Sequence, residues 1–291
     1  MRNSYIRNTI FRIRDLILPK TCGQESWDYI GKCIESDMPF MAARLGAVEV
    51  KAVLYAKKPW LSPFLQQYVR INMPRNAGFF PISKHSLNQF ANMMTSDMQQ
   101  VDVLFSWRPE EIFLRKELKS AYKAAFSDTN IHPEEDTFWT RYLAGKKVLV
   151  IHPFTSTIEK QYKENRTKLF SRPDFIPEFA SLSTIQAVQS IAGNHAGFDT
   201  WFEALDHMKS ETEKADFDIA LIGCGAYGFP LAAHIKRMGK QAIHLGGVLQ
   251  LYFGIKGKRW NDWGLYNDYW VSPGTKEIPK GAEHVEDGCY W

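Results

Sequence analysis

The chain has 291 residues, and 36 Lys and Arg against 32 Asp and Glu give it a formal net charge of +4. With 45% apolar and 23% charged residues, the composition excludes wholesale disorder, a collagen-like repeat and a coiled coil. The four scattered cysteines form no ligand pattern, and neither a secretory signal nor an apolar run long enough to span a bilayer is present. These features predict a cytoplasmic protein.

The first element is an N-terminal arm over residues 1–20. Its apolar positions recur at helical spacing: Ile6, Ile10, Ile13 and Ile17. Cations flank this stripe at Arg7, Arg12 and Arg14, and Pro19 ends the helix. Such a basic amphipathic helix is typical of contact with an anionic membrane, here the inner face of the cell membrane. Docking on the body of the protein or on a second subunit is the alternative.

Apolar, β-rich runs then alternate with helical patterns along residues 21–291. Strands are predicted at Phe40–Arg44, Val101–Ser106, Lys147–His152, Phe217–Ile222 and Gln241–Leu245, with a weaker candidate at Phe179–Leu182. Helices are predicted near Ser26–Ser36, Ala47–Lys57, Ser86–Met98, Glu110–Phe126, Thr157–Phe170, Ile185–Ala192, Thr200–Lys214 and Phe229–Met238. Continuous apolar strands favour a parallel sheet covered on both faces. We therefore expect an α/β fold, a single Rossmann-like domain with a mostly parallel sheet.

The positive charge is unevenly distributed along the chain. No Asp or Glu occurs from Val50 to Ser96 or from Ile219 to Asn261. The first stretch contains Lys51, Lys57, Lys58, Arg70, Arg75 and Lys84, and the second contains Lys236, Arg237, Lys240, Lys256, Lys258 and Arg259. If the two stretches fold together, they would attract an anionic ligand into one cleft. If they do not, they are separate solvated faces.

A glycine motif follows the predicted strand at 217–222. Gly223, Gly225 and Gly228 match G-x-G-x-x-G between a strand and a helix, with Tyr227 in the turn. Glycines let the backbone approach a phosphate, which the amide groups at the helix N-terminus then bind. A nicotinamide site needs an acid about 20 residues further on. No acid follows before Asp262, so we expect phosphate binding without NAD. A tight turn that serves helix packing is the alternative.

The next strand also ends in glycines, Gly246 and Gly247, with Gln250 just beyond them. Adjacent strand ends of a parallel sheet are where ligands bind in open α/β folds. A flexible cationic loop then offers Lys256, Lys258, Arg259 and Trp260. Its cations are candidates to clamp a diphosphate, and its indole is a candidate to stack on a base or sugar. The alternative is a solvated surface loop.

Two further strand–helix junctions contain candidate residues. At one, His152 ends a strand as a candidate general base, and Ser156 begins a helix whose free amide groups suit an anion. At the other, Arg44 is a bidentate anion ligand, Gly46 allows the turn, and Glu49 is a candidate base or metal ligand. A structural strand-end histidine and a carboxylate favoured by the helix dipole are the respective alternatives.

Several segments together resemble the bacterial GT-D type glycosyltransferases and their polysaccharide-biosynthesis relatives. These are RLGAVE at Arg44–Glu49, NAGFFP at Asn76–Pro81, VLVIHPFTSTI at Val148–Ile158, the block Ala220–Trp260 and the ending VEDGCYW. The resemblance implies transfer of a sugar from a nucleotide-sugar donor during assembly of a surface polysaccharide such as capsule or O-antigen. A lipid-linked saccharide is the acceptor that we expect, because it would explain the amphipathic N-terminal arm. The resemblance also implies Mn²⁺ or Mg²⁺, through the family motif R-x-G-D-G-E. Here Ala47 and Val48 replace D-G, and Glu49 alone is a poor metal site unless donor phosphates and other ligands complete it.

We thus expect Glu49 or His152 to take the acceptor proton. The expected donor-binding residues are Arg44, Gly46, Ser156, Gly223, Gly225, Tyr227, Gly228, Gly246, Gly247, Gln250, Lys256, Lys258, Arg259 and Trp260. A non-catalytic nucleotide- or glycan-binding component of the same pathway is the alternative function. Nucleic acid is not an expected partner, because the cations form no stripe along one helix. Whether the chain forms a homo-oligomer is left open.

Overall fold

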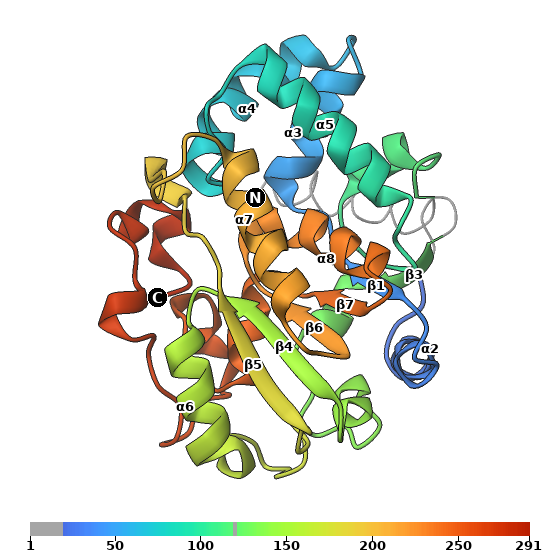
Figure 1. The fold of residues 1–291 in the computed structure, drawn as a ribbon, viewed down its shortest axis with the longest axis vertical. Helices are drawn as coiled ribbons and strands as arrows, with labels where there is room; N and C mark the ends of the chain where they lie inside the picture. The colour runs from blue at the N-terminus through green and yellow to red at the C-terminus, as the bar shows by residue number, and fades with distance from the viewer. Residues whose placement is uncertain (1–19, 119–120) are drawn as a thin grey trace, which may run out of the picture.

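The computed structural model describes residues 20–118 and 121–291, so the predicted N-terminal arm lies, except for Lys20, outside the described residues. A seven-stranded, all-parallel sheet with the order β3-β2-β1-β7-β6-β4-β5 forms the centre of the molecule (Figure 1). Its strands are β1 (Phe40–Ala43), β2 (Val103–Ser106), β3 (Tyr122–Ala125), β4 (Lys147–His152), β5 (Ser181–Gln186), β6 (Ile219–Ile222) and β7 (Gln241–His244). The predicted α/β class with a parallel sheet is confirmed.

Helices cover both faces of the sheet. One hydrophobic core includes side chains of α3 (Ala47–Lys57), α4 (Ser62–Asn76), α5 (Lys84–Met98), α7 (Trp201–Lys214) and α8 (Gly228–Arg237). The opposite core includes α2 (Gln24–Glu35), α6 (Thr155–Asn165), the short α9 (Leu249–Tyr252) and the C-terminal residues from 253 onward. Every residue of β1, β6 and β7 is buried, as expected for strands covered on both sides. Among the described residues, no helix is long and apolar enough to cross a membrane.

Two predicted helices are wrong. The segment 110–126 instead forms a 3-10 turn, Pro109–Leu114, followed by β3. Residues 122–125 pair in register with β2, so sheet pairing overrides the local helical pattern. The segment 185–192 begins as the end of β5, because that strand follows β4 up to the pair His152 and Gln186. The weaker strand predicted at 179–182 is this β5, displaced toward the C-terminus.

Two helices of the described residues, α4 and the four-residue α9, have no counterpart among the predicted elements. Helix α4 contains Pro63 in its first turn and Pro74 in its last. Proline is tolerated in the first turn of a helix, but inside a helix it normally breaks the pattern. The two prolines therefore obscured a regular 15-residue helix.

Candidate active site

A cavity opens at the carboxyl ends of five strands, β1, β4, β5, β6 and β7, and contains about 800 Å³ of empty space with its mouth included. The described residues that line it are Arg44, Asn76, Ala77, His152, Pro153, Phe154, Val188, Gln189, Ser190, Ile191, Gly223, Cys224, Gly225, Ala226, Tyr227, Gly247, Gln250, Val285, Glu286, Tyr290 and Trp291. Strands β4 and β6 are neighbours, yet the helices that follow them, α6 and α8, pack on opposite faces. Such a divergence opens the crevice where ligands bind in open α/β sheets.

The glycine turn after β6 forms the floor of this cavity. Gly223 donates its amide to the Ile151 carbonyl at 2.9 Å, and a Cβ at residue 223 would collide with the His152 ring. Gly225 has a φ of 58°, in the left-handed region that favours glycine. Neither the short turn Gly225–Tyr227 nor α8 has a side-chain cap. The Gly228 amide, which begins α8, donates to the Gly225 carbonyl, so the amide groups left for an anion in the cavity belong to the turn Gly225–Tyr227 that precedes the helix.

Arg44 brings positive charge to the same cavity. Its guanidinium lies against the Trp107 and Phe126 rings, with Cζ 6.0 and 5.6 Å from their centroids, and over Gly246, where a Cβ would collide with it. The Nε atom is buried without a hydrogen-bond partner, and no ion pair of Arg44 occurs among the described residues. Gly246 has a φ of 70°, so both its conformation and its contact require glycine. A guanidinium that is held in position and forms no ion pair among the described residues is suited to a bidentate anion.

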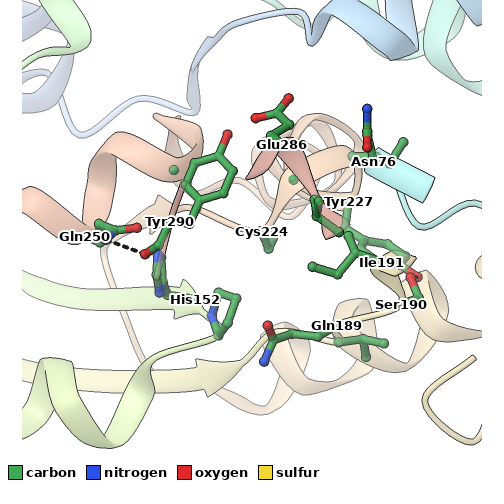
Figure 2. A pocket seen from close by; sticks show the side chains of 18 of the residues that line it. Asn76, His152, Gln189, Ser190, Ile191, Cys224, Tyr227, Gln250, Glu286 and Tyr290 are labelled. Carbon is green, nitrogen blue, oxygen red and sulfur yellow. Dashed lines mark hydrogen bonds between the residues drawn. The ribbon is translucent and has the colours of Figure 1, made fainter. Parts of the chain in front are cut away.

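His152, at the tip of β4, is 2% exposed and lines the cavity (Figure 2). Its Nδ1 accepts a hydrogen bond from the Phe154 amide at 3.1 Å. Burial lowers the pKa of the imidazole from 6.5 to about 3, so the ring is neutral at physiological pH. Because Nδ1 is the acceptor, the proton of the neutral ring belongs on Nε2. His152 therefore offers the cavity a hydrogen-bond donor rather than a base.

Tyr227 and Ser190 form one wall of the cavity. The Tyr227 hydroxyl and Ser190 Oγ lie 2.6 Å apart, and Ser190 Oγ is 2.7 Å from the Gly78 carbonyl. The Tyr227 ring stacks on Trp201 with centroids 4.7 Å apart. Burial raises the pKa of Tyr227, which keeps the phenol protonated. The phenol thus ties the turn after β6 to the segment after β5.

The C-terminal segment 285–291 forms the opposite wall. Gln250 Nε2 donates to the Tyr290 carbonyl at 3.0 Å (Figure 2), and the Tyr290 ring lies against Gly247. Arg259 forms an ion pair with Glu286 and donates to the Tyr290 hydroxyl at 2.8 Å. Arg259 thus fixes the segment beside the cavity, and Glu286 is the carboxylate among the described lining residues.

The predicted donor-binding residues divide into two groups. The structure brings Arg44, His152, Gly223, Gly225, Tyr227, Gly247 and Gln250 together in one cavity. It leaves Gly46, Glu49, Ser156, Gly228, Gly246, Lys256, Lys258, Arg259 and Trp260 outside the lining. Gly246 contributes indirectly, because its lack of a side chain leaves space for the Arg44 guanidinium. Gly228 likewise leaves space for the His244 ring. Ser156 is exposed on the first turn of α6.

The loop 256–260, which was predicted to clamp a diphosphate, instead contacts other parts of the protein. Trp260 is 3% exposed and packs near Tyr290, with ring centroids 6.0 Å apart. The Lys256 amide donates to the Val271 carbonyl, and the Lys256 carbonyl accepts from Gln250 at 2.8 Å. Lys258 Nζ lies near Gly288 of the C-terminal segment. The loop therefore supports the wall of the cavity without lining it.

Glu49 folds back over Gly46 at the start of α3, where a Cβ at residue 46 would collide with its carboxylate. Burial raises the pKa of Glu49, while hydrogen bonds from the amides of residues 49 and 48 and the charge of Arg44 oppose the rise. Its carboxylate therefore caps its own helix, as the dipole alternative predicts. The described residues contain no group of three or more His, Cys, Asp or Glu able to hold a metal ion. The described residues therefore do not fit the metal that the family motif implies.

The two acid-free stretches do meet at the cavity, the first through Asn76 and Ala77 and the second through residues 223–227, Gly247 and Gln250, but the prediction of positive charge there is wrong. None of their twelve Lys and Arg side chains is among the described residues that line the cavity. Lys236 pairs with Asp102 at 2.7 Å, and Arg237 pairs with Asp97 at the same distance. Acids from other parts of the chain neutralise these cations, a pairing that charge counts along the sequence do not reveal.

Several lining residues had no predicted role. Asn76 and Glu286 belong to the segments NAGFFP and VEDGCYW, which carried the family resemblance, so their positions were marked but not their functions. Asn76 Oδ1 is buried without a partner in the protein. Gln189 and Ser190 follow β5, in the segment mistaken for a helix, and no sequence signal marked them.

No family model matches the chain, and no curated protein matches it. Among similar solved structures, a selenomethionine-substituted domain of unknown function 1792 is 13% identical over 92% of this chain and 96% of that chain, with a TM-score of 0.48. Another, described as the highly conserved domain of unknown function 1792 with a distinct glycosyltransferase fold, is 13% identical over 93% and 95%, with a TM-score of 0.48. A third, described as a new glycosyltransferase from Streptococcus sanguinis, is 13% identical over 85% and 87%, with a TM-score of 0.40. Similarity at this level leaves the chemistry of the cavity to be inferred from its own residues.

Proposed function

We propose that the protein is a glycosyltransferase that moves a sugar from a nucleotide-sugar donor to a saccharide acceptor. The observation that carries the proposal is that the guanidinium of Arg44, which forms no ion pair among the described residues, and the uncapped turn Gly225–Tyr227 before α8 line one cavity at the carboxyl edge of the sheet. Two independent groups that favour negative charge meet there. A diphosphate fits these two groups. The inference that the diphosphate carries a sugar comes from the sequence resemblance to GT-D type enzymes.

In this scheme the acceptor hydroxyl attacks the anomeric carbon as the bond to the diphosphate breaks. Arg44 and the amide groups of the turn Gly225–Tyr227 stabilise the charge that develops on the leaving diphosphate. His152 donates a hydrogen bond from Nε2 to the bound donor, and Glu286 is the lining carboxylate placed to accept the acceptor proton. Glu49, which lies behind Arg44, stays the alternative base from the sequence prediction.

The acceptor that we propose is a lipid-linked saccharide of a bacterial surface-polysaccharide pathway, met at the inner face of the membrane. Support comes from the sequence resemblance and from the basic amphipathic pattern of residues 1–20. Release of nucleoside diphosphate from UDP-, GDP- and CDP-sugars, with and without cell lipid extract, tests the reaction. Turnover that requires the extract supports both parts of the proposal. Absence of turnover together with absence of nucleotide binding by calorimetry would reject it.

A non-catalytic nucleotide- or glycan-binding protein is the second candidate. The supporting observation is that Glu286, the lining carboxylate, is already paired with Arg259, while Ala47 replaces the family aspartate. This candidate predicts tight nucleotide binding without diphosphate release. The variants Glu286→Gln and Glu49→Gln separate the two candidates, because loss of turnover at unchanged nucleotide affinity occurs only in an enzyme.

A further inference from the structure

Four large apolar side chains on helix α4 or close to its start are exposed to solvent. Trp60, Phe64, Ile71 and Phe113 are 60%, 82%, 51% and 40% exposed, and together they define the α4 patch. Phe64 and Ile71 are seven residues apart on α4, so they share one face of the helix. Trp60 and Phe113 are in edge-to-face contact with centroids 5.5 Å apart, which joins the turn before α4 to the 3-10 turn 109–114.

Several cations lie on α4 or just before it in the chain, close in sequence to the α4 patch. The patch lies largely within the stretch from Val50 to Ser96, which contains no Asp or Glu. Cations on or beside α4 are Lys57, Lys58, Arg70 and Arg75. Glu110, the carboxylate close to Phe113 in sequence, is held by Arg108 at 2.7 Å and lies 3.9 Å from Lys51. An exposed aromatic cluster with cations close by in the chain is complementary to an anionic, partly apolar surface.

We propose that the α4 patch docks on an anionic lipid membrane, with Trp60, Phe64 and Ile71 entering the interface and these cations facing lipid headgroups. Charge disfavours the other occupants. The predicted arm over residues 1–20 is itself basic, and a second copy would present the same positive face. An anionic bilayer satisfies both the charge and the apolar side chains. Tryptophan, here Trp60, is enriched at this depth of a membrane because its indole ring is amphipathic.

The same helix reaches the cavity. Asn76, the last residue of α4, lines it, and Arg75 Nε donates to the His284 carbonyl at 2.9 Å, next to the wall segment 285–291. Phe64 and Asn76 are separated by about 18 Å at the rise of an α-helix. With α4 lying along the bilayer, the cavity stands beside the membrane surface. This docking does not depend on sugar transfer, and vesicle binding without substrates tests it separately.

The test measures co-sedimentation of the full-length chain with phosphatidylcholine vesicles that contain about a third phosphatidylglycerol, against phosphatidylcholine alone. We expect binding to the anionic vesicles that weakens as salt rises. The double variant Trp60→Ala/Phe64→Ala and the variant Arg70→Glu should each lower the partition coefficient roughly tenfold. Met38→Ala, which trims another apolar side chain that is 66% exposed, and Lys160→Glu, on exposed α6 surface, are the matched controls and should bind like the wild type.

Three results would overturn the proposal. The first is wild-type binding by the double variant, which would assign any membrane contact to residues 1–20 alone. The second is equal binding of the wild type to neutral and anionic vesicles. The third is a wild-type dimer in sedimentation that Trp60→Ala/Phe64→Ala converts to a monomer, because the patch would then be the contact between copies. Thermal unfolding of each variant verifies that it is folded.

Discussion

The strand–helix junctions after β4 and after β6 have the same local structure but differ in whether a carboxylate of the protein already occupies the start of the helix. Each has a buried strand, a short turn and a helix whose first amide groups lack partners within the helix. At α6, Glu277 occupies that position, because it accepts a hydrogen bond from the Thr157 amide at 3.2 Å and another from the Thr157 hydroxyl. At α8 no side chain caps the helix, and the turn lines the cavity. A strand–turn–helix motif gives the capacity to bind an anion, and a carboxylate far away in sequence decides whether that capacity is already used.

Arg259 and Arg44 differ in the same way as the two helix starts, in whether a carboxylate of the protein forms an ion pair with them. Arg259 pairs with Glu286 and holds the C-terminal segment, whereas Arg44 is cradled by Gly246 and two aromatic rings without a carboxylate in an ion pair. Both were candidates for the same diphosphate. The structure assigns Arg259 a structural contact and leaves Arg44 free for a ligand.

The largest expected effect comes from Arg44→Ala. Removing a charge-assisted contact to a diphosphate costs about 2 kcal/mol, or roughly 30-fold in affinity. Calorimetric titration with nucleoside diphosphates measures the change. Arg44→Lys should recover only part of it, since lysine lacks the planar fork. Lys256→Ala, which removes a cation outside the cavity, is the control. An equal loss of affinity in both alanine variants would mean that Arg44 contributes no more to nucleotide binding than a cation outside the cavity.

A smaller loss of affinity is expected from Gly246→Ala, because the new methyl group displaces the Arg44 guanidinium. Gly239→Ala is matched to it. Residue 239 has a φ of 82° and residue 246 a φ of 70°, but a Cβ at 239 meets no atom within 4 Å. Both variants should lose about 1 kcal/mol of stability from backbone strain. Only Gly246→Ala should also weaken nucleotide binding, by roughly tenfold if most of the Arg44 contact is lost. Equal nucleotide affinities in the two variants would show that Gly246 does not position Arg44 for binding.

Glu277→Ala tests the other side of the comparison. Loss of the carboxylate that caps α6 should lower the free energy of unfolding by about 1 kcal/mol. Denaturant unfolding measures the change, and Glu164→Ala, at an exposed position on the same helix, should be close to neutral. Nucleotide affinity should stay unchanged, because no residue of α6 itself, Thr155–Asn165, lines the cavity. A marked drop in affinity would mean that α6 belongs to the site.

The smallest expected effect is a pH dependence from Glu49. Burial raises its pKa above the ordinary 4.5, so the folded protein binds this proton more tightly than the unfolded chain. The contribution of Glu49 to stability therefore falls as pH rises from 4.5 through the folded-state pKa. Glu49→Gln should lack this fall, and the stability of the variant relative to wild type should increase over that interval. A parallel pH profile for the two proteins would show that the carboxylate is well solvated.

The sequence predicted most of the sheet because the central strands are continuous apolar runs, as at 147–152, where predicted and observed bounds coincide. It failed at β3, an edge strand that depends on pairing with β2. It also failed at α4, where Pro63 and Pro74 disguise a helix. In both cases tertiary contacts override the local pattern.

The cavity was predicted in part for a related reason. Glycine turns at strand ends are local, so Gly223, Gly225 and Gly247 were found, together with Arg44 and His152. Whether each polar group is already hydrogen-bonded or paired cannot be read from its neighbours in the sequence. The caps by Glu277 and Glu49, the pairing of Arg259 with Glu286, and the hydrogen bond that places the His152 proton on Nε2 depend on the fold or on side-chain rotamers. Residue types showed where a ligand can bind, and only the structure showed which groups remain free to bind it.

The most direct test of the account is a crystal structure of the full chain with an intact nucleotide-sugar donor. The account predicts diphosphate density against the turn 223–227, with the Arg44 guanidinium on its oxygens and His152 Nε2 within hydrogen-bond distance of the donor. Diphosphate density at the start of α6 or on the loop 256–260, with Arg44 uninvolved, would contradict it.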